Sequence, residues 1–88
     1  MTKYFLKVTT IPTETNPIKT TRVEYYGKRS EYLSNLCTPS EKILMLFGFG
    51  SYEAAELEKK RRQAVYDRDY EKFHTYTHTI EILSEDVI

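Results

Sequence analysis

The chain has 88 residues, and its 13 basic and 13 acidic side chains give a formal charge of zero at pH 7. A chain of this length buries only about 60 to 65% of its unfolded surface and supports one hydrophobic core, so we expect residues 1–88 to form a single domain. Zero net charge argues against the broad positive field of a protein that binds nucleic acid mainly through its phosphates. Basic residues outnumber acidic ones in residues 1–40, which leaves room for a basic patch there.

The compartment is indicated by Cys37, which is the only cysteine. A single cysteine excludes an intramolecular disulfide, and a small domain without one is typical of a reducing compartment. Residues 1–10 hold too short an apolar run for a signal peptide, and no stretch of about 18 apolar residues could span a bilayer. We therefore expect a cytoplasmic protein with no membrane partner, and we interpret Cys37 as a structural thiol.

Two strands are predicted near the amino terminus. KYFLKVTT, residues 3–10, alternates apolar and polar side chains, with Tyr4, Leu6 and Val8 on one side. This period of two is typical of a half-buried strand. Prolines and an asparagine then interrupt the pattern, and TTRVEYYG resumes it over residues 20–27. We predict a hairpin of two strands joined by a loose loop.

Residues 38–49 give two conflicting signals. Thr38, Pro39 and Glu41 have the order of a helix cap, a first-turn proline and a capping-box acid, whereas KILMLFGF is a short continuous apolar run. A helix here would be short, and a central strand buried on both faces fits the run better. We predict a strand over residues 43–49, with a short helix over residues 39–47 as the alternative.

The strongest helical signal begins at Ser51. A capping serine is followed by acidic residues early, by basic residues at 59–62, and by glutamate–lysine and glutamate–arginine pairs at a spacing of four. We predict that this helix ends between Gln63 and Asp69. KFHTYTHTIEIL, residues 72–83, is rich in threonine, aromatic and β-branched residues and predicts the last strand. Its more apolar face comprises His74, Tyr76, His78, Ile80 and Ile82.

The order β-β-β-α-β predicts an α+β fold. About four strands should form a small antiparallel or mixed sheet, with one long helix packed on one face. If the strand over residues 43–49 and the last strand paired in parallel, the connection through the helix would be right-handed. A single helix leaves much of the other sheet face without cover from this chain.

FGFGSYEAAEL, residues 47–57, places two glycines and a serine ahead of the helix, as a phosphate-binding loop would. A dinucleotide fingerprint requires glycine or alanine three positions after its second glycine, where this chain has Glu53. The carboxylate would repel a phosphate, and the Gly-Lys-Ser or Gly-Lys-Thr sequence of a P-loop does not occur. We interpret the segment as a turn in which glycines relax the backbone and Ser51 caps the helix.

Catalytic and metal-binding patterns are weak. His74 and His78 would lie on one strand face but about 13 Å apart, too far to share one metal ion. Thr75 replaces the glutamate of the metalloprotease pattern, and one cysteine cannot build a thiolate cluster. We expect structural or surface histidines, with pH sensitivity or a metal shared across a dimer as alternatives. A chain this short encloses little, so we expect no cofactor, no metal, no catalytic residue and no enzymatic activity.

The predicted helix is unusual on a wheel of about 100° per residue. A modest stripe of Ala54, Leu57, Ala64 and Val65 is expected to face the core, with Arg61 inside it. Tyrosines, of which the chain has eight, gather on nearly the opposite side. We interpret that side as a partner-binding face with tyrosine and arginine anchors, the alternative being that a loop covers the rings. The predicted face comprises Tyr52, Lys59, Arg62, Gln63, Tyr66 and Tyr70.

The leading functional hypothesis is a non-enzymatic protein–protein interaction module that docks on a larger protein or complex. In size, in tyrosine and lysine content and in the lack of a catalytic constellation, the chain resembles small accessory proteins of phages and mobile elements, including inhibitors of host defence; the resemblance is one of composition alone. Self-association as a homodimer, through the uncovered sheet face or an edge strand, is compatible with this function. The alternative is nucleic-acid binding on the open sheet face, through Tyr4, Tyr25, Tyr26, Lys28 and Arg29.

Overall fold

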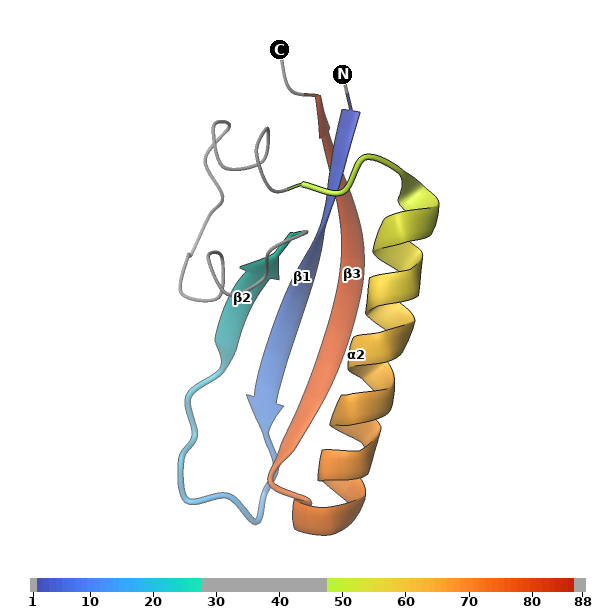
Figure 1. Ribbon diagram of the computed structural model, residues 1–88. Helices are drawn as coiled ribbons and strands as arrows, with labels where there is room; N and C mark the ends of the chain where they lie inside the picture. The colour runs from blue at the N-terminus through green and yellow to red at the C-terminus, as the bar shows by residue number, and fades with distance from the viewer. Residues whose placement is uncertain (1, 28–47, 87–88) are drawn as a thin grey trace.

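The computed structural model describes residues 2–27 and 48–86. Along the chain these form strand β1 (Thr2–Pro12), strand β2 (Arg22–Tyr26), helix α2 (Tyr52–Phe73) and strand β3 (Tyr76–Asp86). In this part of the chain the strands make a three-stranded sheet in the order β2-β1-β3, antiparallel throughout, and α2 lies along one face of it (Figure 1). The α+β class and the single long helix on one face are as predicted.

The predicted strand over residues 43–49 lies mostly outside the described residues. Cys37 and the alternative helix over residues 39–47 lie outside them as well. The last residue of the predicted strand, Phe49, forms one antiparallel bridge with Tyr4. The Tyr4 amide donates to the Phe49 carbonyl at 2.9 Å, and the Phe49 amide donates back at 2.7 Å. β3 occupies the other edge of β1, so β1 separates Phe49 from β3. The described residues therefore hold three strands instead of four. They contain no parallel pair of strands connected through the helix.

The central strand β1 supplies the core because its alternation places every second side chain under α2. Leu6 is fully buried and Val8 is 2% exposed. Leu6 is opposite Tyr26 of β2 and Ile82 of β3, so the predicted strand faces of β1 and β3 meet in register. The main core cluster comprises Leu6, Val8, Phe49, Ala55 and Ile80, with Tyr4, Tyr26, Tyr66 and Ile82 packed against it.

The sheet face turned away from α2 is only partly open. Phe5 on this face is 5% exposed, and Tyr25 and Leu83 pack against it. Ile11 and Val23 remain 44% and 37% exposed. The sheet face that we predicted to be uncovered is therefore exposed at Ile11 and Val23. At Phe5 the same face is covered, contrary to the prediction.

Helix α2 begins as predicted. The Ser51 hydroxyl accepts a hydrogen bond from the Ala54 amide at 3.2 Å, and Glu53 places a negative charge in the first turn, where it favours the helix dipole. The predicted role of the glycines is wrong for the described residues, because no glycine there has a positive φ. A side chain at Gly50 would also meet nothing within 4 Å.

The helix runs past the predicted end between Gln63 and Asp69 and stops at Phe73. Nothing in that stretch interrupts a helix, since glycine and proline are absent from it. His74 ends the helix in the left-handed conformation, with φ 55°, and its amide donates to the Tyr70 carbonyl at 2.9 Å. His74 is therefore a helix cap and not a strand residue, and β3 starts only at Tyr76. In the described chain no helix is both long and apolar enough to cross a membrane.

The face of α2 that packs on the sheet is not the predicted one. Leu57, assigned to the core stripe, is 72% exposed, and Ala55 is the buried residue of the helix. Tyr66, assigned to the surface, packs against the core cluster. The helix has no strong apolar stripe, so its rotation follows the largest apolar areas, which are the tyrosine rings, because burial energy scales with area.

The hairpin loop is tied to the turn between α2 and β3, which corrects the prediction of a loose loop. Asn16 is 4% exposed, and its Nδ2 donates to the Thr75 carbonyl at 2.9 Å. Its Oδ1 accepts from the Ile18 amide at 2.9 Å, closing a turn within the loop. The Thr13 hydroxyl donates to the His74 carbonyl at 2.6 Å. Two segments distant in sequence, the hairpin loop and the turn between α2 and β3, are thereby fixed together at one end of the molecule (Figure 1).

Replacing Asn16 with alanine should destabilise the protein, because the Ile18 amide would lose its acceptor and the Thr75 carbonyl would keep only the Thr13 amide as a donor. We expect the free energy of unfolding to fall by about 1–3 kcal/mol in urea denaturation. Thr20→Ala in the exposed part of the same loop is the control and should change it by less than about 0.5 kcal/mol. Equal effects of the two substitutions would contradict the proposed role of Asn16.

Candidate functional site

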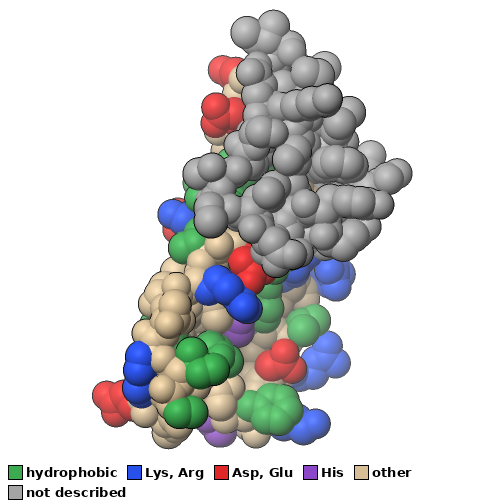
Figure 2. All heavy atoms as spheres, turned by 90° about the vertical axis from the view of Figure 1, so that its left-hand side faces the viewer, with side chains coloured by type: hydrophobic (Ala, Val, Ile, Leu, Met, Phe, Trp, Pro, Cys, Tyr) green, Lys and Arg blue, Asp and Glu red, His purple; other side chains and the backbone are tan. Residues whose placement is uncertain are grey.

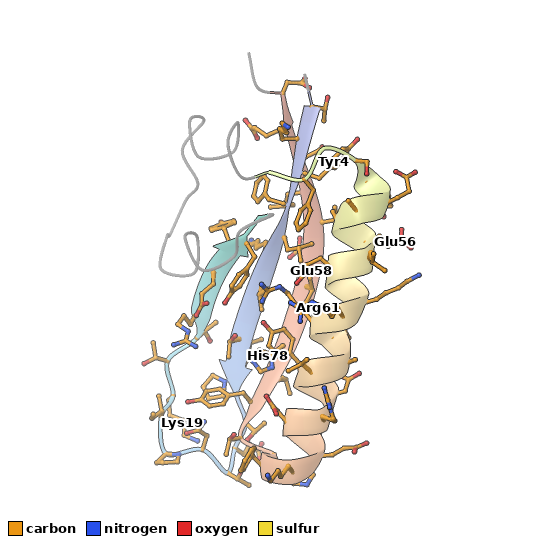
Figure 3. All side chains as sticks on the ribbon, viewed as in Figure 1. Tyr4, Lys19, Glu56, Glu58, Arg61 and His78 are labelled. Atoms are coloured by element: carbon orange, nitrogen blue, oxygen red, sulfur yellow. The ribbon has the colours of Figure 1, made fainter. Side chains whose placement is uncertain are left out.

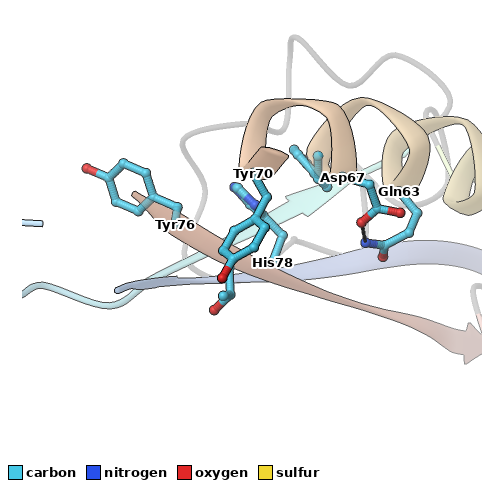
Figure 4. A pocket seen from close by; sticks show the side chains of 7 residues that line it. Gln63, Asp67, Tyr70, Tyr76 and His78 are labelled. Atoms are coloured by element: carbon cyan, nitrogen blue, oxygen red, sulfur yellow. Dashed lines mark hydrogen bonds between the residues drawn. The ribbon is translucent and has the colours of Figure 1, made fainter. Parts of the chain in front are cut away.

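A cleft of about 200 Å³ lies between the carboxyl-terminal half of α2 and the beginning of β3 (Figure 4). We call it the tyrosine cleft. Its helical residues recur every three or four positions and so share one side of α2, while its strand residues are the first three of β3. The tyrosine cleft is lined by Gln63, Tyr66, Asp67, Tyr70, Tyr76, Thr77 and His78.

The floor of the cleft is an aromatic stack. The rings of Tyr66 and His78 are parallel within 6°, with centroids 4.0 Å apart. His78 is opposite Thr10 in the sheet and thus shares the helix-facing side of β3 with Ile80. The centroid of the Tyr76 ring lies 6.5 Å from that of the His78 ring. Tyr70 is 43% exposed and lies at the rim of the cleft. The stack joins the cleft directly to the core, because Tyr66 also packs against the core cluster.

The imidazole of His78 is held in its neutral form. Burial lowers the pKa of His78 below its ordinary value, because a partly buried charge loses hydration. Asp69 and Glu24 oppose this shift, and Arg22 adds to it. The net direction is downward, so the neutral form of the His78 ring is favoured at neutral pH.

The polar side of the cleft is set by Gln63 and Asp67. Gln63 Nε2 donates to Asp67 Oδ1 at 2.9 Å across one helical turn. Figure 4 shows this pair toward one end of the cleft and Tyr76 at the other, with Tyr70 and His78 between them. The hydrogen bond holds the carboxylate on the cleft side of the helix. Because His78 is neutral, the formal charge of the described lining residues is the negative charge of Asp67.

A second polar cluster lies deeper, between α2 and β2. The Arg62 guanidinium sits 3.9 Å above the Tyr26 ring, and its Nε lies 3.1 Å from a Glu58 oxygen. This buried Nε makes no hydrogen bond, so its contact with Glu58 is an ion pair alone. The Tyr26 hydroxyl donates to Glu24, which also pairs with Arg22 at 2.6 Å. Burial, and then the hydrogen bond to Glu24, raise the pKa of Tyr26. The cluster fastens α2 to the sheet.

Figure 3 shows the two sides of the helix that result. Glu58 lies on the side of α2 toward the sheet, with its side chain 22% exposed, whereas Glu56 points away and pairs with Lys60 at 3.3 Å. Arg61, expected inside the core stripe, is 62% exposed and pairs with Glu58. Its neighbour Arg62 is only 12% exposed. Of the basic residues 59–62, Lys60 and Arg61 are therefore solvated, whereas Lys59 and Arg62 are partly buried.

The predicted partner-binding face divides into three parts. Gln63, Tyr66 and Tyr70 meet in the tyrosine cleft. Lys59 is half-buried and Arg62 is fixed over Tyr26. Tyr52 is 48% exposed but lies near the other end of α2, with its ring 6.0 Å from that of Tyr4.

Sequence reasoning missed Asp67 and the three strand residues of the cleft. Gln63, Asp67 and Tyr70 share one side of α2 only because the helix continues through them. The predicted helix ended between Gln63 and Asp69, so their common side could not be recognised. The alternation of β3 predicts a shared face for Tyr76 and His78, but it does not indicate which helical residues that face contacts. His74, predicted on that face, contacts the edge of the Tyr70 ring from the helix cap, with centroids 5.1 Å apart.

The residues of the nucleic-acid hypothesis do not share a face. Tyr4 and Tyr26 pack against the core on the helix side of the sheet, and Tyr25 packs with Phe5 on the other side. Lys28 and Arg29 lie outside the described residues. On the side of the molecule that β2 occupies, basic and acidic side chains of the described part are interspersed (Figure 2). Residues 2–27 and 48–86 also contain no group of three histidine, cysteine or acidic residues arranged to hold a metal ion.

The His78 environment predicts a pH effect on stability. The unfolded chain binds a proton at the ordinary histidine pKa of about 6.5, and the folded chain at a lower pH. Stability contributed by neutral His78 is therefore present above about pH 6.5 and is lost as the pH falls through the folded-state pKa. Urea denaturation at pH 7.5 and pH 5 should show the wild type losing more stability than His78→Gln. Parallel losses would contradict the burial of the ring.

Substitutions at Arg61 and Arg62 test which side of α2 faces the sheet. Arg62→Ala should lower the free energy of unfolding by about 1–2 kcal/mol, since it removes the contact with Tyr26 and the packing of the side-chain stem. Arg61→Ala removes an exposed pair with the same glutamate and should cost less than about 0.5 kcal/mol. Thermal or urea denaturation of both variants measures the difference. A larger loss from Arg61→Ala would show that the helix is rotated as the sequence had suggested.

Comparison of the chain with protein-family models, with curated proteins and with solved structures finds no match. No relative supplies a function, so the function has to be inferred from the geometry of the molecule itself.

Proposed function

We propose that this chain is a non-enzymatic protein-binding module that docks on a larger protein through the tyrosine cleft. The observation that carries the proposal is the convergence of Tyr66, Tyr70 and Tyr76 from two elements around one concave surface. Tyrosine offers apolar area with a polar tip at little entropic cost, and it is enriched at the energetic centres of protein interfaces. Tyrosine rings at the floor and sides of a small cleft suit an anchor side chain from a partner.

Exposed apolar side chains also lie at the end of the molecule where α2 ends and β3 begins, near the tyrosine cleft. Phe73 in the last turn of α2 is 58% exposed, and Ile18 in the hairpin loop is 56% exposed. Ile18 and Tyr76 line a second cavity of about 250 Å³ next to the tyrosine cleft. Hydrophobic groups exposed together and rimmed by polar residues are typical of interaction surfaces. The hydrogen bonds of Asn16 and Thr13 hold these segments in place before binding, which lowers the entropic cost of association.

A small module of this kind would act by occupying a site on a larger complex. This mode of action suits an accessory or inhibitor protein of the phage or mobile-element type, which the composition of the chain resembles. The nucleic-acid alternative has no comparable support, since its tyrosines are divided between the two faces of the sheet.

Site-specific photo-crosslinking tests the proposal. A photoreactive phenylalanine analogue placed at Tyr70, in cells that naturally produce the chain, should give a defined protein adduct. The adduct should persist from low to physiological salt and after nuclease treatment, because a tyrosine-anchored contact depends little on phosphate charge. Tyr76→Ala in the same chain should remove it.

The same analogue at Leu57 is the matched control, because Leu57 is more exposed at 72% but lies on α2 away from the cleft. It should give no such adduct. Identical adducts from both positions, or adducts that nuclease abolishes, would refute protein docking at the cleft.

A further inference from the structure

We infer that the tyrosine cleft receives a cationic side chain, arginine in preference to lysine, from the partner protein. This inference rests on the proposed function and adds to it the chemistry of the group that the cleft recognises. It follows from the size of the cleft, from the kind of surface that lines it and from the sign of its charge.

The size of the cleft selects one side chain. Its volume of about 200 Å³ is below the range of roughly 300–1,000 Å³ that is typical of sites for drug-sized ligands. The cleft lies open between a helix and an edge strand, so a side chain can enter while its backbone remains on the surface. A single anchor residue is the occupant that fits both facts.

The lining favours a flat cation. Tyr70 and Tyr76 present aromatic rings, whose faces carry partial negative charge and attract ammonium or guanidinium groups. A guanidinium is planar and weakly hydrated and also stacks on such faces, which a compact ammonium cannot do. The molecule already contains this arrangement in its interior, where the Arg62 guanidinium lies 3.9 Å above the Tyr26 ring.

The charge of the lining excludes an anion. The described lining residues include a carboxylate, Asp67, and neither lysine nor arginine. Gln63 holds one Asp67 oxygen at 2.9 Å, and the carboxylate keeps further lone pairs for a second donor. Neutral His78 adds no repulsion, and of the charged groups that act on this ring Asp69 and Glu24 are negative and Arg22 is positive. A phosphate or carboxylate would meet Asp67 without a compensating cation, whereas an arginine would form a charge-assisted hydrogen bond with it.

A peptide titration followed by NMR tests the inference on the isolated protein. The probe is acetyl-Gly-Arg-Gly-amide, compared with the same peptide carrying citrulline, which has nearly the same shape but no charge, and with the lysine peptide. The arginine peptide should give saturable shifts at Tyr70, Tyr76 and His78, with a Kd about three- to tenfold lower than that of the citrulline peptide. The lysine peptide should bind with intermediate affinity.

Asp67→Asn keeps the size of the side chain and should reduce the affinity for the arginine peptide to that for the citrulline peptide. Asp69→Asn removes the same charge two residues away and should have less effect. Both positions are exposed, and circular dichroism checks that each variant is folded. Equal affinities for arginine and citrulline peptides, or shifts confined to the other end of α2, would overturn the inference.

The outcomes separate this inference from the proposed function. If Tyr70 crosslinks to a partner but the protein does not distinguish arginine from citrulline, the docking proposal stands and the cationic anchor is wrong. If the arginine peptide binds but no partner crosslinks at Tyr70, the docking proposal fails. An adduct at twice the mass of the chain would identify a second copy as the occupant and would refute docking on a different, larger protein.

Discussion

The stacking of Tyr66 on His78 is the contact on which the rest of the molecule depends. It sets the rotation of α2, because the helix carries no apolar stripe strong enough to fix its orientation and a large ring buries more area than several alanines. Once Tyr66 faces the sheet, Arg62 must lie over Tyr26 one turn earlier, and Tyr70 must emerge at the rim one turn later. The core and the tyrosine cleft are therefore consequences of the same contact.

Hydrogen bonds between the hairpin loop and the turn after α2 stabilise the end of the molecule that carries the cleft. A left-handed residue at position 74 ends the helix, and the carbonyls of His74 and Thr75 are then used by Thr13 and Asn16 of the hairpin loop. These bonds satisfy the carbonyls of the helix cap and of the turn that follows it. The hairpin loop and the start of β3 are consequently held in fixed relation, so the cleft exists before any partner arrives.

The chemistry of the cleft follows from what surrounds it. An uncharged His78 at its floor, tyrosine rings at its side and a carboxylate held by Gln63 are the features from which we infer a preference for positive charge, in a chain whose overall charge is zero. A net charge near zero says nothing about such a site, because local fields at close range outweigh the sum over the surface. The same pairing of guanidinium and tyrosine serves packing at Arg62 and, in our proposal, recognition at Tyr70.

The sequence by itself determined the elements whose signals are local: the alternating strands, the serine cap of α2 and the α+β class. Periodicity and capping act over a few neighbouring residues, so they can be read without knowing the fold. Only the tertiary structure decided where α2 ends, which side of it is buried and which residues form the cleft. Gln63, Asp67 and Tyr70 come together with Tyr76 and His78 because a weakly amphipathic helix takes its rotation from the sheet beneath it, and that contact joins residues that no local pattern connects.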